Sequence, residues 1–399
     1  MPIQVFPTPS AGASYSSQPP ASASSVLLDG QLVTASSIST SVTGTGAPWL
    51  LYANGAGTTT ITIAGTPYTV TAGSTVGTSA YTGSQSVTVA ANFASTAPAT
   101  FTASTMPSSS AWQSVTYGNG YYVAVQGSGT TAGAYSTNGT TWTASTMPSG
   151  GSTAGWQSVT YGNGYFVAIA FGTTAGAYST NGTTWTASTM PSSSAWWGVA
   201  YGNGYFVAVA VGTSAGAYST NGTSWTASTM SASAYWRSIT YGNGYFVAVA
   251  NTTVGAYSTN GTTWTASTLP SNSSWFGVTY GNGYYVAVQN SSTTAGAYST
   301  NGTTWTASTM PTSDNWSSVT YGNGYFVAVA NGTTPGAYSS NGTTWTASTM
   351  PSASDWNGVA YGNGKFISVA DSTNAGAYFA QPALLPVAYG IYNGATVRA

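Results

Sequence analysis

The side chains that could carry acid–base, metal-ligand or redox chemistry are few in this 399-residue sequence. Charged residues make up 2% of the chain, against about a quarter in ordinary soluble domains. The charged side chains are Asp29, Asp314, Asp355, Asp371, Arg237, Lys365 and Arg398. Glutamate, histidine and cysteine are absent. Disulfides and metal sites built from thiolate or imidazole are therefore excluded, and we predict no cofactor; only a weak calcium site made of oxygen ligands stays open.

Two carboxylates have a spacing that could serve catalysis. Glycoside hydrolysis needs two carboxyl groups that flank the bond to be cut. Asp314 and Asp355 precede two tryptophans of a repeated pattern by two residues and by one, so they could lie on neighbouring loops. We favour the alternative that they serve turns or solubility, as we do for Asp371, and we assign Asp29 to a hairpin turn. We therefore predict that the chain is not an enzyme.

Charge and hydropathy exclude two further classes of partner. Binding to a polyanion grows with the number of phosphates that Lys and Arg neutralise, and this chain has three such cations, widely separated. No apolar run approaches the ~18–20 residues that span a bilayer. The sequence therefore predicts neither nucleic-acid binding nor membrane insertion.

The elements that would position any functional side chain come from one repeated stretch. A sequence close to YGNGYFVAVA occurs seven times at intervals of 39 to 44 residues. Its first tyrosine falls at Tyr117, Tyr161, Tyr201, Tyr241, Tyr280, Tyr321 and Tyr361. A tryptophan stands five residues before each, at Trp112, Trp156, Trp196, Trp236, Trp275, Trp316 and Trp356. A fixed period of this length is typical of propellers, solenoids and repeat arrays.

Each repeat predicts four short strands. From Trp156 onward, the segments WQSVTY, YFVAIA, AGAYST and TTWTAST are rich in aromatic, β-branched and threonine residues. Asn-Gly pairs, such as Asn181 and Gly182, readily take the positive φ angles of tight hairpin turns. The second segment is apolar on both faces and must be covered on both. Four-stranded antiparallel units stacked around an axis, as in a β-propeller, provide that cover.

The two ends of the array predict how it closes. FTASTMP, at residues 101–107, matches the fourth segment of a repeat, whereas the last repeat lacks its fourth segment. We expect the leading strand to complete the trailing blade and so remove an open edge. The predicted fold is all-β: a seven-bladed β-propeller of four-stranded blades whose ring closes with an offset of one strand. A linear β-solenoid is the alternative, but its two ends do not meet, so it would not explain the offset of one strand.

The segment AYSTNGTTW, at residues 134–142, resembles the Asp-box of sialidase-like propellers, with Asn in place of Asp. The pattern recurs around Asn138, Asn181, Asn221, Asn260, Asn301 and Asn341. The resemblance implies an outer hairpin of a propeller blade and says little about activity. Sialidases use three arginines, a tyrosine with a glutamate partner and an acidic proton donor. This chain has two arginines and no glutamate, so we exclude sialidase activity.

Aromatic residues supply the candidate binding surface. The two repeated tryptophan rows are explained by core packing, because one enclosed Trp buries about 150–250 Å². Three aromatic residues instead break the repeat near the start of a first strand: Trp197, Tyr235 and Phe276. We expect these three to form an exposed ligand-binding surface.

The regions outside the repeats suggest further parts of the molecule. Residues 1–24 read as an extended arm rich in Pro and Ser, residues 25–100 as a small β domain, residues 101–382 as the propeller and residues 383–399 as an apolar tail. The tail either folds back on the N-terminal domain or adds as a strand to a neighbouring subunit. Its candidate assembly contacts are Leu384, Leu385, Val387, Tyr389, Ile391 and Tyr392.

The start of the chain and its composition together give the functional prediction. MPIQVFPTPSAG resembles the N-termini of virion structural proteins from tailed phages, and it has no secretory signal pattern. Low charge removes the repulsion that keeps proteins monomeric. We predict a non-enzymatic subunit of an extracellular assembly, a phage tail appendage or a filament, whose partners are other copies of itself. The alternative is an adhesin-like propeller that binds a cell-surface glycan. Either would be extracellular or virion-associated.

Overall fold

The computed structural model describes residues 4–6, 37–53, 58–71, 75–90, 97–127, 129, 131–150, 155–371, 373–380 and 389–392. These residues form strands and turns, and no helix occurs among them, so none there is long and apolar enough to cross a membrane. The chain divides into two compact units. One comprises Met1–Thr96 with Pro382–Ala399, and the other comprises Ala97–Gln381.

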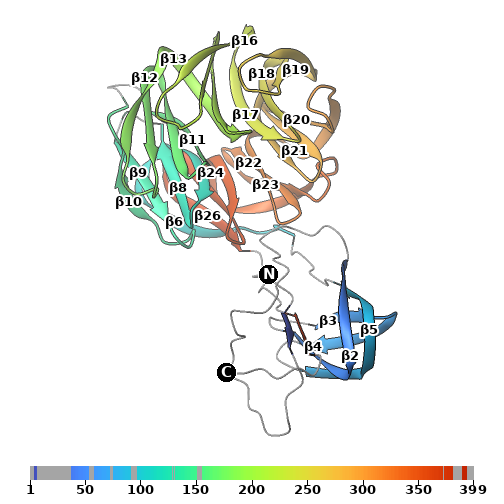
Figure 1. The fold of residues 1–399 in the computed structure, drawn as a ribbon. Helices are drawn as coiled ribbons and strands as arrows, with labels where there is room; N and C mark the ends of the chain where they lie inside the picture. The colour runs from blue at the N-terminus through green and yellow to red at the C-terminus, as the bar shows by residue number, and fades with distance from the viewer. Residues whose placement is uncertain are drawn as a thin grey trace. The chain divides into compact units, whose positions relative to one another are not determined.

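The smaller unit contains one six-stranded sheet in the order β1-β27-β2-β5-β3-β4 (Figure 1). Its strands are β1 (Gln4–Phe6), β2 (Ser37–Ala53), β3 (Thr58–Ile63), β4 (Thr66–Thr71), β5 (Thr75–Ala90) and β27 (Tyr389–Tyr392). Strand β27 pairs parallel with β1 and antiparallel with β2 of its own chain. Tyr389, Ile391 and Tyr392 thus lie in an intramolecular sheet, whereas Leu384, Leu385 and Val387 lie outside the described residues. Strand addition to a neighbouring subunit stays a prediction.

The larger unit is built from the predicted repeat, and the second repeat shows its anatomy. Strand β11 (Trp156–Gly162) pairs with the start of β12 (Tyr165–Ser179) through a tight turn. In that turn Asn163 has φ 46° and Gly164 has φ 81°, which only Asn and Gly adopt readily. The end of β12 then pairs with the start of β13 (Thr186–Gly202). The Asn-Gly pair at Asn163 and Gly164 therefore forms the tight hairpin that it predicted, whereas at Asn181 and Gly182 only the glycine takes a positive φ, of 72°.

The other strands of this unit repeat the arrangement (Figure 1). They are β6 (Thr102–Ser110), β7 (Trp112–Gly118), β8 (Tyr121–Gln126), β9 (Ala132–Ser136), β10 (Thr143–Thr146), β14 (Tyr205–Ala210), β15 (Thr213–Ser219), β16 (Thr226–Ala234), β17 (Trp236–Gly242), β18 (Tyr245–Ser258), β19 (Thr265–Gly281), β20 (Tyr284–Ser299), β21 (Thr306–Gly322), β22 (Tyr325–Asn331), β23 (Thr333–Ser339), β24 (Thr346–Gly362), β25 (Lys365–Asp371) and β26 (Thr373–Ala380). Several are long because one strand ends a repeat and begins the next. In β13, Thr186 pairs with β12 and Trp196 pairs with β14.

The ends of the repeat array meet. Strand β6, the first of the larger unit, pairs antiparallel with β26, its last, with Thr102 opposite Tyr378. A second link joins Phe101 and Thr349, whose backbone nitrogen and oxygen are 2.9 Å apart. The leading strand therefore occupies the place of the missing fourth segment of the last repeat.

The same glycine–tyrosine contact joins each repeat to the next around the whole array. The first glycine of each YGNG packs so closely on the YGNG tyrosine of the next repeat that a Cβ there would lie 2.0 Å from the tyrosine Cγ. The pairs are Gly118–Tyr161, Gly162–Tyr201, Gly202–Tyr241, Gly242–Tyr280, Gly281–Tyr321, Gly322–Tyr361 and Gly362–Tyr117. Because the last pair joins the last repeat to the first, these contacts form a closed cycle.

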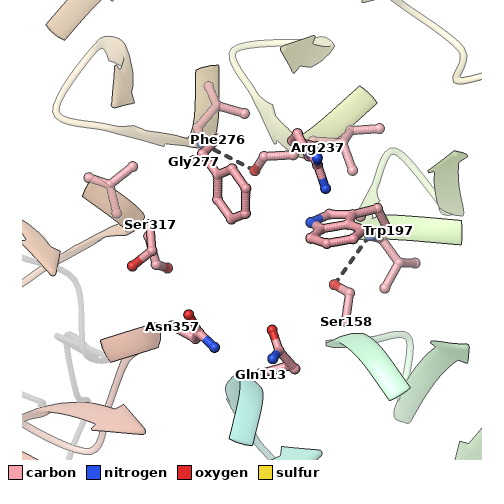
Figure 2. Close-up of a pocket in the computed structure, with 15 residues that line it drawn as sticks. Gln113, Ser158, Trp197, Arg237, Phe276, Gly277, Ser317 and Asn357 are labelled. Atoms are coloured by element: carbon pink, nitrogen blue, oxygen red, sulfur yellow. Dashed lines mark hydrogen bonds between the residues drawn. The ribbon is translucent and has the colours of Figure 1, made fainter. Parts of the chain in front are cut away.

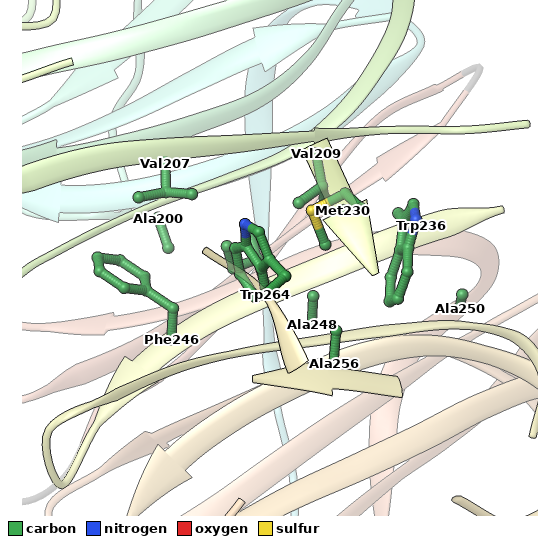
Figure 3. Packing of buried hydrophobic residues seen from close by; sticks show 11 residues of the cluster. Ala200, Val207, Val209, Met230, Trp236, Phe246, Ala248, Ala250, Ala256 and Trp264 are labelled. Carbon is green, nitrogen blue, oxygen red and sulfur yellow. The ribbon is translucent and has the colours of Figure 1, made fainter. Parts of the chain in front are cut away.

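The hydrophobic core lies between neighbouring repeats (Figure 3). Trp236 and Phe246 of one repeat pack with Val207 and Val209 of the repeat before, and Ala248 leaves room for the facing side chains. The tryptophans that open the repeats are all 0% exposed. The prediction that the tryptophan rows serve core packing is thus confirmed for this row.

The Asn-containing turn is held by hydrogen bonds from its backbone to neutral side-chain acceptors. Asn181 Oδ1 accepts hydrogen bonds from the backbone N–H groups of Thr183 and Thr184, each at 2.9 Å. Ser179 Oγ accepts one from Gly182 N–H at 2.9 Å. Both acceptors are neutral, so the turn keeps its backbone hydrogen bonds without any charge.

Candidate ligand-binding site

The candidate site is built from one position of the repeat, the residue that follows each opening tryptophan. The neighbouring positions hold similar residues in every repeat, but this one changes chemistry from repeat to repeat. Its occupants are Gln113, Gln157, Trp197, Arg237, Phe276, Ser317 and Asn357. We call this set the variable row.

A β-bulge sets the variable row apart from the strands that carry it. In the second repeat Trp156 pairs with Ala170 and Ser158 pairs with Ile169, so Gln157 has no partner of its own. The same register shift follows the opening tryptophan of every repeat. A bulge bends the strand and redirects the extra side chain, and bulges are frequent next to functional sites.

Six members of the variable row line one cavity of about 110 Å³. Figure 2 shows them extending from separate strands toward a shared space: Gln113, Trp197, Arg237, Phe276, Ser317 and Asn357. Serine, glycine and aliphatic residues that follow them in the same strands complete the wall. The cavity therefore lies where the first strands of several repeats converge.

Hydrogen bonds between neighbouring first strands hold this wall in place. Ser158 Oγ accepts from Val199 N–H at 3.3 Å, and Ser238 Oγ accepts from Val278 N–H at 3.1 Å (Figure 2). These contacts join the second repeat to the third and the fourth to the fifth beside the cavity. They fix the strands from which the variable row projects.

An aromatic–arginine cluster forms one side of the cavity. The rings of Trp197 and Phe276 lie edge to face, with centroids 5.9 Å apart. The Arg237 guanidinium carbon lies 4.1 Å from the Trp197 ring centroid and 5.2 Å from that of Phe276. Cation–π attraction and edge-to-face packing both stabilise this arrangement.

Arg237 is partly withdrawn from water. Burial lowers the pKa of its guanidinium from the ordinary value, with Tyr235 opposing the shift. The Arg237 Nε is buried and has no hydrogen-bond partner among the described residues. The pKa of arginine is so high that the group stays charged at neutral pH.

The opposite side of the cavity is polar and uncharged. The amide side chains of Gln113 and Asn357 face the cavity across from Trp197 and Phe276 (Figure 2). Ser317 Oγ lies within hydrogen-bond distance of the carbonyl oxygens of Val329, at 3.1 Å, and Trp356. The lining thus offers ring stacking, one guanidinium, and amide groups that donate or accept hydrogen bonds.

The structure brings together two of the three aromatic residues that the sequence singled out. Trp197 and Phe276 line the cavity, whereas Tyr235 does not line it and is 52% exposed. Sequence reasoning missed Arg237, along with Gln113 and Asn357. The signal that could have found them was their place in the variable row.

The carboxylates do not form a catalytic pair in this cavity. Asp314 lies opposite Thr293, and Asp355 lies opposite Asp371 across neighbouring strands. None of these three lines the cavity. In the part of the chain that the structure describes, no group of three acidic, His or Cys residues could hold a metal ion.

Comparison with known proteins gives a fold and no family. No protein-family model matches the chain, and no curated protein matches it. Streptogramin B lyase is similar in structure, with a TM-score of 0.62 and 13% identity over 70% of this chain and 97% of the lyase chain. A catalytically inactive virginiamycin B lyase from Staphylococcus aureus with quinupristin has the same TM-score and identity, over 70% and 98%. YCF48 bound to a D1 peptide has a TM-score of 0.57 and 14% identity over 71% and 96%.

These structures are propeller-like repeat proteins, which confirms the prediction of an all-β, propeller-type repeat fold. They support neither the Asp-box resemblance nor the resemblance of the N-terminus to phage proteins. At such low identity the likeness shows the fold alone.

Two functional predictions are overturned. The prediction of a non-enzymatic phage-tail or filament subunit is wrong, because the similar structures are a lyase and YCF48 and nothing in them supports a virion subunit. The prediction that the chain is not an enzyme is withdrawn as well, because an enzyme has this fold. The first prediction rested on the start of the chain as well as on the scarcity of charge, and the second on the scarcity of charge. A propeller can gather a few varied side chains in one place whatever its overall composition.

Proposed function

We propose that this chain is a ligand-binding β-propeller that binds part of an organic molecule or peptide in the cavity lined by the variable row. The seven repeats then form seven four-stranded blades, and β6 completes the last blade. The pairing of β6 with β26 and the cycle of glycine–tyrosine contacts support this closed ring. In a ring of this kind the first strands lie innermost, and residues at their starts meet near one end of the axis.

One observation carries the proposal: the variable row is bulged in every repeat, and six of its members converge on one cavity. If the row served only the structure of the repeat, similar residues would suffice in each blade, as they do at the neighbouring positions. A large aromatic residue beside a small cavity instead supplies a surface on which an apolar group can pack.

The size of the cavity limits what it can hold. Its volume of about 110 Å³ lies well below the ~300–1,000 Å³ of pockets that enclose a drug-sized ligand. An apolar cavity of ~150 Å³ is enough for benzene. The cavity therefore takes an end group of a ligand, and the remainder lies outside its mouth.

The similar structures agree with such a role without assigning it. One is a lyase with quinupristin and another is YCF48 bound to a D1 peptide, so proteins of this fold bind organic molecules and peptides. We transfer neither ligand, nor the lyase activity, to this chain. Other copies of the chain and a cell-surface glycan also stay predicted partners.

A fluorescent aromatic probe tests the proposal. Anilinonaphthalene sulfonate becomes fluorescent in apolar sites, and we expect it to bind the wild-type chain with one saturable site. The double variant Trp197→Ala/Phe276→Ala should bind it at least about tenfold more weakly, a loss of roughly 1.4 kcal/mol.

Tyr235→Ala is the matched control, because Tyr235 is an aromatic residue that directly precedes β17, the strand that carries Arg237, but lies outside the cavity lining. It should leave the affinity unchanged. Equal affinities for the wild type and the double variant, with both folded by circular dichroism, would rule out the cavity as the binding site.

A further inference from the structure

The Arg237 guanidinium is the one charged group in the cavity lining, and nothing in that lining balances it. The described carboxylates, Asp314, Asp355 and Asp371, lie elsewhere. No ion pair joins Arg237 to a carboxylate within the residues that the structure describes. The cavity is therefore locally positive in a chain whose net charge is −1.

We propose that the cavity selects ligands that carry an anionic group, a carboxylate or a group of similar geometry, which hydrogen-bonds to the Arg237 guanidinium. This inference rests on the proposed function and names the chemical class of the ligand: an organic anion with an apolar or aromatic body. The body packs on Trp197 and Phe276, and the anion meets Arg237.

The geometry prepares Arg237 for this role. Two rings lie against the guanidinium, with centroids 4.1 and 5.2 Å from its central carbon. Rings that pack on a guanidinium limit its motion and leave its N–H groups to bind in the guanidinium plane. Figure 2 shows the terminal nitrogens of Arg237 directed into the space between Trp197 and Phe276. The side chain therefore needs little reorganisation when a ligand arrives.

The energetics favour an anion over a neutral group. A partly buried cation that lacks a counter-ion has lost solvation without gaining an ion pair. Cation–π contacts offset part of that cost. A carboxylate matches the fork of guanidinium N–H donors, and charge-assisted hydrogen bonds of this kind are about twice as strong as neutral ones.

The cavity volume suits this assignment. About 110 Å³ can hold an anionic head group with a short apolar portion, but not a large aromatic anion in full. The amides of Gln113 and Asn357 lie across the cavity and can donate hydrogen bonds to a further oxygen of the ligand.

A matched pair of probes tests the inference. Anilinonaphthalene sulfonate and phenylnaphthylamine share an aromatic skeleton, but only the first carries an anionic group. We expect the wild type to bind the sulfonate at least about tenfold more tightly than the neutral amine. Arg237→Gln should remove this preference, while Arg237→Lys should keep part of it because the charge remains.

The outcomes separate the two proposals. If the wild type binds both probes equally and Arg237→Gln changes neither affinity, the anion inference is wrong and the binding proposal survives. If Trp197→Ala/Phe276→Ala binds both probes as the wild type does, the binding proposal itself fails. Thermal unfolding of each variant shows whether it is folded. Arg237→Met is a second neutral variant, which keeps an unbranched side chain without the charge. A preference for the sulfonate that persists in both neutral variants would overturn the role of Arg237.

Discussion

Replacing Gly362 with alanine tests whether the last repeat packs on the first. Gly362 ends β24, and a Cβ at this position would lie 2.0 Å from Cγ of Tyr117 in the first repeat. The obstacle is an aromatic ring that packs 4.7 Å, centroid to centroid, from Tyr122, so it has little freedom to retreat.

The size of the effect follows from two opposing terms. Overpacking a filled site costs about 1–3 kcal/mol. Gly362 has no positive φ angle, so alanine fits its backbone and restricts the unfolded chain, which returns about 0.4–1 kcal/mol. We expect Gly362→Ala to lower the free energy of unfolding by about 1–2 kcal/mol.

Gly242→Ala is the matched control within the array. Gly242 meets Tyr280 at the same 2.0 Å, and Tyr285 donates its hydroxyl hydrogen bond to the Gly242 carbonyl as Tyr122 does to that of Gly362. In a closed ring the two variants should lose similar stability in urea unfolding. In an open array Tyr117 would be absent from Gly362, and Gly362→Ala would be neutral or stabilising while Gly242→Ala stayed destabilising. That second result would refute ring closure.

Three further predictions address the turns, the buried tyrosines and the C-terminal segment. Asn181→Ala removes the acceptor of two backbone N–H groups and should lower the free energy of unfolding by about 0.5–2 kcal/mol, whereas Asn181→Asp keeps the acceptor and should change it little. Burial, with neighbouring tyrosines, raises the pKa of Tyr122 and Tyr285 above the ordinary value of 10.0, so the unfolded chain loses these protons first and stability should fall as the pH rises above 10.0. Replacing both with Phe, the residue found at this position in other repeats, should make that alkaline loss shallower; equal pH profiles would contradict this assignment. Finally, if residues 383–399 exchange strands between subunits, the full chain should sediment as oligomers and a chain that ends at residue 382 should not; equal sedimentation of both would exclude the exchange.

The repeat, its turns and its closing strand could be predicted from the sequence because each depends on local chemistry. The positive φ angles of Asn163 and Gly164 follow from the Asn-Gly pair, and the pairing of β6 with β26 follows from the offset between the two ends. Such features are encoded by residue type and by order along the chain.

The site was only partly predictable. Trp197 and Phe276 drew attention because large aromatic residues broke the repeat, but Tyr235 did so too and lies outside the cavity lining. The difference between them is the β-bulge after each opening tryptophan. The bulge redirects the side chain of the residue that follows the tryptophan, and no sequence motif marks it. In the sequence Arg237 is one of three cations and indicates only that the total charge is low. Its contribution to binding depends on its position in the cavity lining.

The most direct test of the account is a crystal structure of the chain with anilinonaphthalene sulfonate. We predict density for the probe in the cavity, with its sulfonate within hydrogen-bond distance of the Arg237 guanidinium and an aromatic ring against Trp197 or Phe276. An empty cavity at saturating probe, or a probe bound elsewhere on the chain, would contradict the assignment of this site.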